Sequence, residues 1–207
     1  TLSLHDALPI HGTLALQGVG SSGQTSNGDF AGNDENSYHV VTGRGTDETA
    51  LLDGFIITAG HANGERFSEQ AEGGGMWNQP GSPTVTNCIF SKNTAQHGGG
   101  MFTEFESKPI VTNCTFTGNK AYIDGGGMFN RLSNPILIKC VFTNNSAGSG
   151  GGMSNNTNSN PTVTDCTFIG NKAYVDGGGM FNLVESCPKV SDCNFISNSA
   201  EQGAGMK

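Results

Sequence analysis

The stretch PTVTNCIFSKNTAQHGGGM, residues 83–101, contains one complete copy of a motif that recurs about every 26 residues along the chain. The motif ends in a glycine triplet, once Gly-Ala-Gly, followed by a methionine, and successive methionines lie 25, 27, 25, 27 and 26 residues apart. These methionines are Met76, Met101, Met128, Met153, Met180 and Met206. A period of this length is typical of repeat architectures, in which each repeat is one structural unit stacked on the next.

Three further columns of residues recur inside each period. A cysteine comes first, a phenylalanine follows two positions later, and an asparagine completes an F-x-x-N motif. The cysteines are Cys88, Cys114, Cys140, Cys166 and Cys193. The phenylalanines are Phe90, Phe116, Phe142, Phe168 and Phe195. The asparagines are Asn93, Asn119, Asn145, Asn171 and Asn198, and an alanine lies two residues after each of them.

The repeats are rich in glycine, asparagine and β-branched residues and show no helical spacing. Leucine-rich, ankyrin and tetratricopeptide repeats need helices or other anchor residues, and propeller blades need longer periods. The pattern therefore predicts an all-β, single-stranded parallel β-helix, a solenoid with three short strands in each coil. At ~4.8 Å per coil, about six or seven coils make a rod roughly 30 Å tall.

The repeat frame extends upstream of the first glycine triplet. In LLDGFIITAGHA, residues 51–62, Phe55 takes the cysteine position, Ile57 the phenylalanine position and Ala62 the alanine position. An insertion of roughly residues 63–72 follows. We therefore expect β-helix coils over residues 51–207.

The remaining N-terminal residues fall into two parts. Residues 11–50 are expected to form a β segment with the first coil or coils. The first ten residues, TLSLHDALPI, resemble a translated sequencing adapter, so we assign them no role in fold or function. Lys207 falls within a repeat, which leads us to expect a chain truncated at its C-terminus. The open strand edges of such a chain predict self-association, which light scattering detects.

Most of the repeated columns have a structural explanation. The phenylalanine and alanine columns are expected to fill the core with large and small side chains. The asparagine column is expected in turns, where stacked amides bond to each other and to the backbone and tolerate left-handed dihedrals. The glycine triplets mark a corner where side chains do not fit or φ is positive.

The five stacked cysteines are predicted to be reduced, buried and small hydrophobic residues. Parallel Cβ directions give poor geometry for bridging, and a column spreads metal ligands along a line instead of converging them on one point. We therefore predict no metal site. Cys187 lies outside the column, and a local bridge to Cys193 stays open for it.

Composition excludes two classes of partner. Ten basic and eighteen acidic residues give a net charge of −8, so no basic surface is available to neutralise nucleic acid phosphates. The longest apolar run is far shorter than the ~18 residues of a membrane-spanning helix. We predict no nucleic acid partner and no transmembrane segment in this sequence.

The repeat resembles a known surface-protein pattern. F-x-x-N paired with G-G-[A/G]-apolar, here Phe90 and Asn93 followed by GGGM at residues 98–101, is similar to the double signature of the polymorphic outer membrane proteins. Those are autotransporter passengers that act as adhesins. This chain has glycine where that family most often has alanine, and methionine where it has isoleucine, leucine or valine.

A second resemblance covers residue 14 to the end. SYHVVTGRGTDETALLDGFIITAG, residues 37–60, together with the coils resembles secreted right-handed β-helix proteins of free-living bacteria, within the pectin-lyase-like superfamily. The resemblance implies a right-handed β-helix that is secreted or anchored at the membrane or wall. It leaves the activity open, because this fold carries lyases, hydrolases, adhesins and scaffolds.

Two near-identical loops carry the best catalytic candidates. NKAYIDGGG (residues 119–127) and NKAYVDGGG (residues 171–179) place the same side chains two coils apart. The catalytic candidates are the pairs Asp124 and Asp176 and Lys120 and Lys172, and the loops also carry Tyr122 and Tyr174, which are candidate ligand-binding residues. The carboxylates would then lie about 9–10 Å apart, at the far edge of the range for inverting hydrolases. Duplication of a repeat without any catalytic role also explains the loops. In that interpretation Asp124 and Lys120 are solvated turn residues.

A second candidate is the residue after each methionine, namely Trp77, Phe102, Phe129, Ser154 and Phe181. If the methionines point inward, strand alternation sends these rings outward as an aromatic strip that stacks on sugars or on a protein partner. In the alternative interpretation, neighbouring loops cover the rings.

Calcium and histidine chemistry have weaker support. Residues 28–37 offer Asp29, Asp34 and Glu35 as Ca²⁺ ligands but lack the EF-hand spacing, so a solvated loop is expected. The histidines have no acid or nucleophile at a recognisable spacing, and His39 is expected at an outward strand position.

Together these features predict an extracellular or surface-displayed β-helix that mediates adhesion to a glycan or protein ligand without catalysis and without a cofactor. A polysaccharide-active enzyme or its carbohydrate-binding module is the first alternative. A purely structural spacer is the second.

Overall fold

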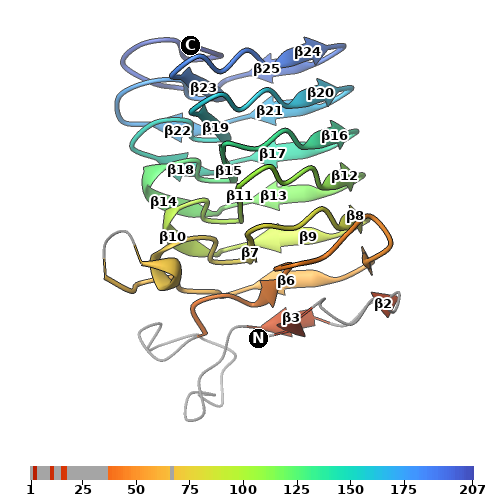
Figure 1. Ribbon diagram of the computed structural model, residues 1–207. Helices are drawn as coiled ribbons and strands as arrows, with labels where there is room; N and C mark the ends of the chain where they lie inside the picture. The colour runs from red at the N-terminus through yellow and green to blue at the C-terminus, as the bar shows by residue number, and fades with distance from the viewer. Residues whose placement is uncertain (1, 4–9, 12–14, 18–36, 66–67) are drawn as a thin grey trace.

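The protein is a parallel β-solenoid whose coils stack from the N-terminal end to the C-terminal end (Figure 1). The structure, a computed structural model, describes residues 2–3, 10–11, 15–17, 37–65 and 68–207, the first three segments by their backbone alone. Each coil contributes one strand to each of three seven-stranded sheets, here called A, B and C. This arrangement confirms the predicted all-β solenoid with three strands per coil.

The three long sheets contain short strands throughout. Sheet A consists of β1 (Leu2–Ser3), β4 (Val41–Thr42), β7 (Met76–Asn78), β11 (Met101–Glu104), β15 (Met128–Arg131), β19 (Met153–Asn156) and β23 (Met180–Leu183). Sheet B consists of β2 (Ile10–His11), β5 (Leu51–Asp53), β8 (Thr84–Thr86), β12 (Ile110–Thr112), β16 (Ile136–Ile138), β20 (Thr162–Thr164) and β24 (Lys189–Ser191). Sheet C consists of β3 (Ala15–Gln17), β6 (Ile56–Thr58), β9 (Ile89–Ser91), β13 (Thr115–Thr117), β17 (Val141–Thr143), β21 (Thr167–Ile169) and β25 (Asn194–Ile196).

A fourth sheet, D, lies between sheets C and A along the chain and has four strands. They are β10 (Thr94–His97), β14 (Lys120–Asp124), β18 (Ser146–Ala147) and β22 (Lys172–Ala173). A single turn of 3-10 helix, η2 (Glu69–Ala71), lies in the insertion that precedes β7. In the described residues this is the one helical element.

Equivalent repeat residues pair directly with each other. Met101 pairs with Met128 in sheet A, and Phe116 pairs with Phe142 in sheet C. Upstream, Ile57 pairs with Phe90, which confirms the frame assigned to residues 51–62. One sequence period is therefore one coil, and identical side chains form ladders along the solenoid.

The phenylalanine ladder is the centre of the core. Neighbouring rings stack nearly parallel, with centroids 4.6–4.8 Å apart from Phe90 to Phe195. Met76 to Met180 in sheet A point inward and are fully buried, as expected from strand alternation. Valine and leucine of sheet B complete the same cluster, so the predicted large rungs of the core are confirmed.

The asparagine ladder bonds as predicted. Each buried amide donates from Nδ2 to the amide oxygen of the next coil, for example Asn119 to Asn145 at 3.0 Å. It also donates to a main-chain carbonyl of the preceding coil, as Asn119 does to Phe90 at 2.9 Å. The expected link to left-handed dihedrals is wrong for this ladder. The positive φ angles belong to other turn residues, such as Asn87 and Asn113 immediately before the cysteines.

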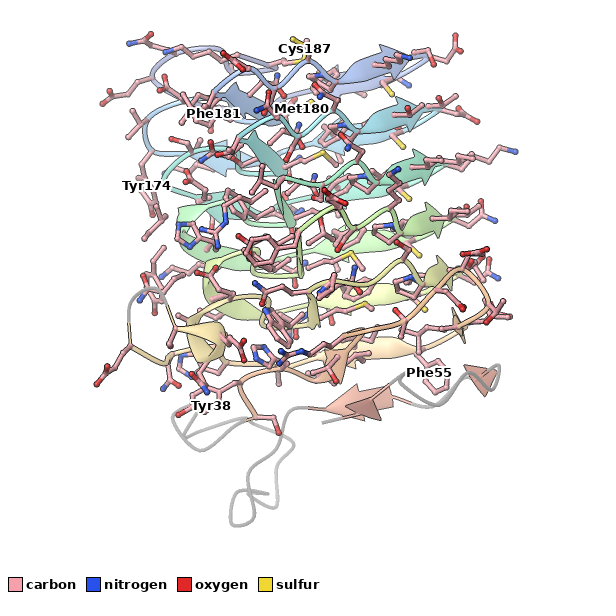
Figure 2. The ribbon with its side chains drawn as sticks, in the orientation of Figure 1. Tyr38, Phe55, Tyr174, Met180, Phe181 and Cys187 are labelled. Carbon is pink, nitrogen blue, oxygen red and sulfur yellow. The ribbon has the colours of Figure 1, made fainter. Side chains whose placement is uncertain are left out.

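The cysteine ladder is reduced and buried from Cys88 to Cys166, as predicted. Each thiol lies near main-chain groups; Cys166 Sγ, for example, accepts the Cys140 N–H at 3.3 Å. Cys187 is exposed near the C-terminal end (Figure 2), and Cys193 is half-buried. Both are free thiols, so the local bridge left open for them does not form.

Candidate functional site

The two near-identical loops leave the solenoid in the same way. Ala95 of β10 pairs with Ala121 of β14, but the next pair is His97 with Asp124, so β14 contains one extra residue. Such a bulge re-aims side chains and bends the strand outward. The second loop follows β22 and carries Tyr174 at the equivalent position. In both loops the extra residue presents a tyrosine to solvent.

Each loop forms a small cationic aromatic surface, which we call a platform. In the lower platform, Lys120 Nζ lies 4.8 Å from the centre of the Tyr122 ring, and Tyr122 is 54% exposed. In the upper platform, Lys172 Nζ lies 5.3 Å from the Tyr174 ring, and Tyr174 is 61% exposed. Tyr174 lies at the left edge of the solenoid in Figure 2.

A gap separates the platforms. The intervening coil has Ser146 and Ala147 in β18, followed by Gly148, where the flanking coils have a tyrosine. The Tyr174 N–H bonds the Ala147 and Gly148 carbonyls, so the loops remain two rungs apart. Two strand spacings place the platforms ~9–10 Å apart with no side chain as large as tyrosine between them.

The two aspartates that follow the tyrosines have different partners. Asp124 Oδ2 lies 4.0 Å from His97 Nε2, and His97 Nδ1 lies 3.0 Å from Glu72 Oε2 on its other side. Asp176 Oδ1 instead accepts a hydrogen bond from Lys207 Nζ at 2.7 Å. We call Glu72, His97 and Asp124 the charge cluster. The two aspartates that sequence analysis grouped as one catalytic pair therefore belong to two separate sets of contacts.

Burial sets the electrostatics of the charge cluster. Glu72 and His97 are buried, and the Asp124 side chain is 18% exposed. Burial raises the pKa of the Asp124 carboxyl; the positive charge of His97 acts to lower that pKa, and the Glu72 carboxylate adds to the increase. The Asp124 carboxyl therefore binds its proton more tightly than a solvated aspartate does.

This geometry corrects two expectations from the sequence. Asp124 is not a solvated turn residue, because it ends β14 and packs beside His97. His97 does have acidic partners, and they come from neighbouring coils instead of nearby residues. The signal was present in the sequence. The residue directly before each glycine triplet forms a ladder, and three successive rungs of it are Glu72, His97 and Asp124.

The aromatic strip lies on the predicted face, but the expectation that it is exposed is wrong. Trp77, Phe102, Phe129 and Phe181 are all buried, and the first three form a second hydrophobic cluster outside the main core. The alternative interpretation, in which neighbouring groups cover the rings, is the observed one.

Several polar side chains supply this cover. The His39 ring stacks on Trp77 at 5.4 Å, and the His97 ring packs against Phe129 at 5.0 Å. The Arg131 guanidinium lies over Phe102 at 5.6 Å and is also paired with the buried Glu104. His39 precedes β4, so its expected outward strand position is also wrong.

The comparisons with known proteins decide the family. The model of the right handed beta helix region matches residues 44–206, which is most of the chain. The chain belongs to this right-handed β-helix family. No curated protein and no solved structure matches it.

This β-helix contains a further ladder that was not predicted from the sequence. At the third position of the sheet A strands, Thr103 donates to Asn130 at 2.7 Å, Asn130 to Asn155 at 2.8 Å, and Asn155 to Asn182 at 2.9 Å. The M-[F/S]-N pattern at three of these strands is the sequence signal that identifies the ladder. It fixes the register of sheet A beneath the covered aromatic rings.

The β-helix also has a corner groove that the sequence did not reveal. A cavity of about 590 Å³ lies along the turns that follow sheet A, lined by Pro80, Phe105, Glu106, Leu132, Asn134 and Asn158. Phe105 and Leu132 are exposed and have φ angles of 53° and 51°. Bulky residues adopt the left-handed region at an energetic cost, so the turn geometry of the stacked coils holds them there.

The described residues contain no group of three or more histidine, cysteine or acidic side chains arranged for a metal ion. The Ca²⁺ candidates Asp29, Asp34 and Glu35 lie outside the described residues. Among the described residues, no helix is long and apolar enough to cross a membrane.

Proposed function

We propose that this β-helix is a non-catalytic ligand-display module that binds glycan chains outside the cell and thereby mediates adhesion. The observation that carries the proposal is the pair of Lys–Tyr platforms, presented at equivalent positions two coils apart. The resemblance to surface-displayed β-helix proteins supports the extracellular location.

The chemistry of the platforms suits a sugar ligand. An exposed tyrosine ring offers a flat apolar face for the C–H groups of a pyranose, while its hydroxyl and a nearby ammonium offer hydrogen bonds. Lys120 and Lys172 also place positive charge locally on a protein whose net charge is −8. Acidic sugar units therefore gain most from these platforms.

Spacing adds a second reason. The platforms are held by one rigid ladder, so an extended chain that contacts the lower platform reaches the upper one without further ordering of the protein. Binding at the second platform is then intramolecular, and avidity exceeds the affinity of either platform alone. The intervening coil has Gly148 at the tyrosine position, so it contributes no side chain between the two rings.

The test is binding to a panel of neutral and acidic polysaccharides, measured by affinity electrophoresis and calorimetry. Tyr122→Ala and Tyr174→Ala are each expected to weaken binding about two- to tenfold, the effect of one lost aromatic contact. Because avidity needs both platforms, each single substitution already removes it, and the double variant is expected to lose the remaining aromatic contact and most of the residual binding. Lys120→Gln and Lys172→Gln should reduce binding mainly to acidic chains.

Matched controls are available on the same surface. Tyr38→Ala removes a tyrosine of similar exposure that belongs to neither platform, and Lys139→Gln removes an exposed lysine at a turn. Neither is expected to change binding. If the platform variants bind as the wild type does, or if the controls lose as much, the platforms are not the site.

The same samples separate the alternatives. Release of reducing ends or of unsaturated sugars from a bound polysaccharide, abolished by Asp124→Asn or Asp176→Asn, would move the assignment to a carbohydrate-active enzyme. Absence of both binding and turnover across the panel would favour a structural spacer.

A further inference from the structure

We propose that Glu72, His97 and Asp124 form a proton-operated latch that tightens ligand binding at the lower platform in mildly acidic solution and leaves the upper platform unaffected. The latch regulates the binding site proposed above, so the measurement of ligand affinity that tests it rests on that proposed function. The NMR measurement of the two tyrosines, which also tests the latch, does not need a ligand.

The geometry places a titratable ring between two carboxylates. His97 Nδ1 lies 3.0 and 3.1 Å from the two Glu72 oxygens, and His97 Nε2 lies 4.0 Å from Asp124 Oδ2. Glu72, His97 and Asp124 come from three successive coils, joined by main-chain pairing. A protonated ring donates from both nitrogens and so can bond both carboxylates at once, whereas a neutral ring has one donor.

Among the residues that the structure describes, no lysine or arginine pairs with Glu72 or Asp124. The elements packed around His97 contribute Glu72 after η2, Asp124 of β14 and the uncharged Phe129 ring of β15. Of the other charged side chains described on this side, Glu69 pairs with Arg44 and Glu104 with Arg131. His39 is a second titratable group that interacts with Glu72; its ring bonds the Gly73 carbonyl, and burial lowers its pKa. The charge balance of the cluster therefore depends on the proton of His97.

The direction of the switch follows from these charges. Histidine is the side chain that ordinarily changes charge between about pH 5 and 8. When His97 carries its proton, it neutralises the carboxylates on both sides and holds β14 to the coil below. When it loses the proton, Asp124 is left partly buried near a second carboxylate with no cation between them. The attraction between the His97 ring and the Asp124 carboxylate is then lost, while the main-chain pairing of Asp124 remains.

The latch acts on the lower platform through two residues of chain. Tyr122 and Asp124 lie on the same bulged strand, and Asp124 is the residue where the bulge rejoins the register of β10. Fixing Asp124 therefore fixes the end of the bulge that presents Tyr122. A tyrosine that is already held in its binding position loses less conformational entropy when the ligand binds.

The upper platform is an internal control. Its aspartate, Asp176, bonds Lys207, whose Nζ also donates to Gln202 at 2.7 Å. Lysine keeps its charge through the range in which histidine titrates. The two loops are nearly identical in sequence, so a difference between them in pH response reports their different partners.

The first experiment follows both loops without ligand. Fluorotyrosine is placed at residue 122 or residue 174, and ¹⁹F NMR is recorded from about pH 5 to 8 together with the imidazole resonances of His97. The Tyr122 signal is expected to shift with the midpoint of His97, and the Tyr174 signal to stay constant. In His97→Gln the Tyr122 shift is expected to vanish. A Tyr122 signal that stays flat while His97 titrates would overturn the latch.

The second experiment measures affinity for a neutral polysaccharide, whose own charge does not change with pH. Tyr174→Ala keeps the lower platform, and its affinity is expected to fall about fivefold or more between pH 5 and 8. Tyr122→Ala keeps the upper platform and should show no such fall. Equal pH dependence in the two variants would also overturn the latch. If neither variant binds any polysaccharide, the proposed function fails, and the ligand-free NMR titration still decides the latch.

Discussion

Replacing Asn145 by alanine tests whether the buried amide ladder holds the coils together. The Asn145 side chain makes four hydrogen bonds, all to buried groups. Its Nδ2 donates to the Phe116 carbonyl at 2.9 Å and to Asn171 Oδ1 at 3.0 Å. Its Oδ1 accepts the main-chain N–H and the Nδ2 of Asn119, both at 3.0 Å. Asn145→Ala removes all four bonds in one substitution.

The expected loss follows from the groups left behind. Asn171 Oδ1 still accepts the Asn145 main-chain N–H, and Asn119 Nδ2 still donates to the Phe90 carbonyl. The Phe116 carbonyl loses one donor but stays in the ladder between β13 and β17, whereas the Asn119 N–H loses its acceptor. A buried group left without a partner costs roughly 1–3 kcal/mol, so the Asn119 N–H alone predicts a loss of roughly 1–3 kcal/mol in the free energy of unfolding.

Urea unfolding followed by circular dichroism measures this loss, and hydrogen exchange locates it. Because each coil contacts only its neighbours, exchange should accelerate first in the coils on either side of residue 145. Asn134→Ala is the control, since Asn134 Oδ1 accepts a single exposed bond from the Asn160 N–H, and its loss should stay below ~1 kcal/mol. Equal losses for the two variants would show that the ladder does not stabilise the fold.

Three further outcomes follow from the structure. Phe142→Ala, which removes a ring stacked on both faces, should cost about 3–5 kcal/mol in urea unfolding, whereas the exposed Phe105→Ala should cost far less. Burial raises the pKa of Asp124 above 3.8, so the folded protein binds this proton more tightly than the unfolded chain does. Its contribution to stability should therefore fall as pH rises from about 3.8 through the folded-state pKa, and a pH series of unfolding measurements should show this fall removed in Asp124→Asn. Alkylation of the native protein should modify Cys187 rapidly and Cys88 to Cys166 only after unfolding, which mass spectrometry counts directly.

The sequence predicted the fold because ladder positions repeat as residue types. The spacing of GGGM, Cys and F-x-x-N defines one coil, and register then follows without further information. The inward direction of the phenylalanines and methionines follows from strand alternation. Side-chain burial on the outer face did not follow, because Trp77 and Phe102 are covered by His39 and Arg131, residues that the repeat does not specify.

The candidate site was only half predictable for the same reason. Tyr122 and Tyr174 were recognisable from the duplicated loops, and the exposure of both rings agrees with a ligand-binding role without testing it. The partners of Asp124 were not recognisable from local spacing, since Glu72 and His97 lie 25 residues apart along the chain and meet across one rung. A ladder must be read across coils, one position at a time, before its chemistry can be seen.

Because the coils stack, the same loop sequence can have different neighbouring side chains in two coils. Lys–Ala–Tyr followed by an aliphatic residue and Asp occurs in both loops, yet the first Asp faces a histidine and the second faces a lysine. In a solenoid the neighbours of a residue are set by the same position of the adjacent coils. A single substitution at that position, such as histidine at residue 97, therefore changes the chemistry of a loop without changing the loop itself. Duplicated repeats can in this way retain a common binding surface while differing in how each copy responds to its environment.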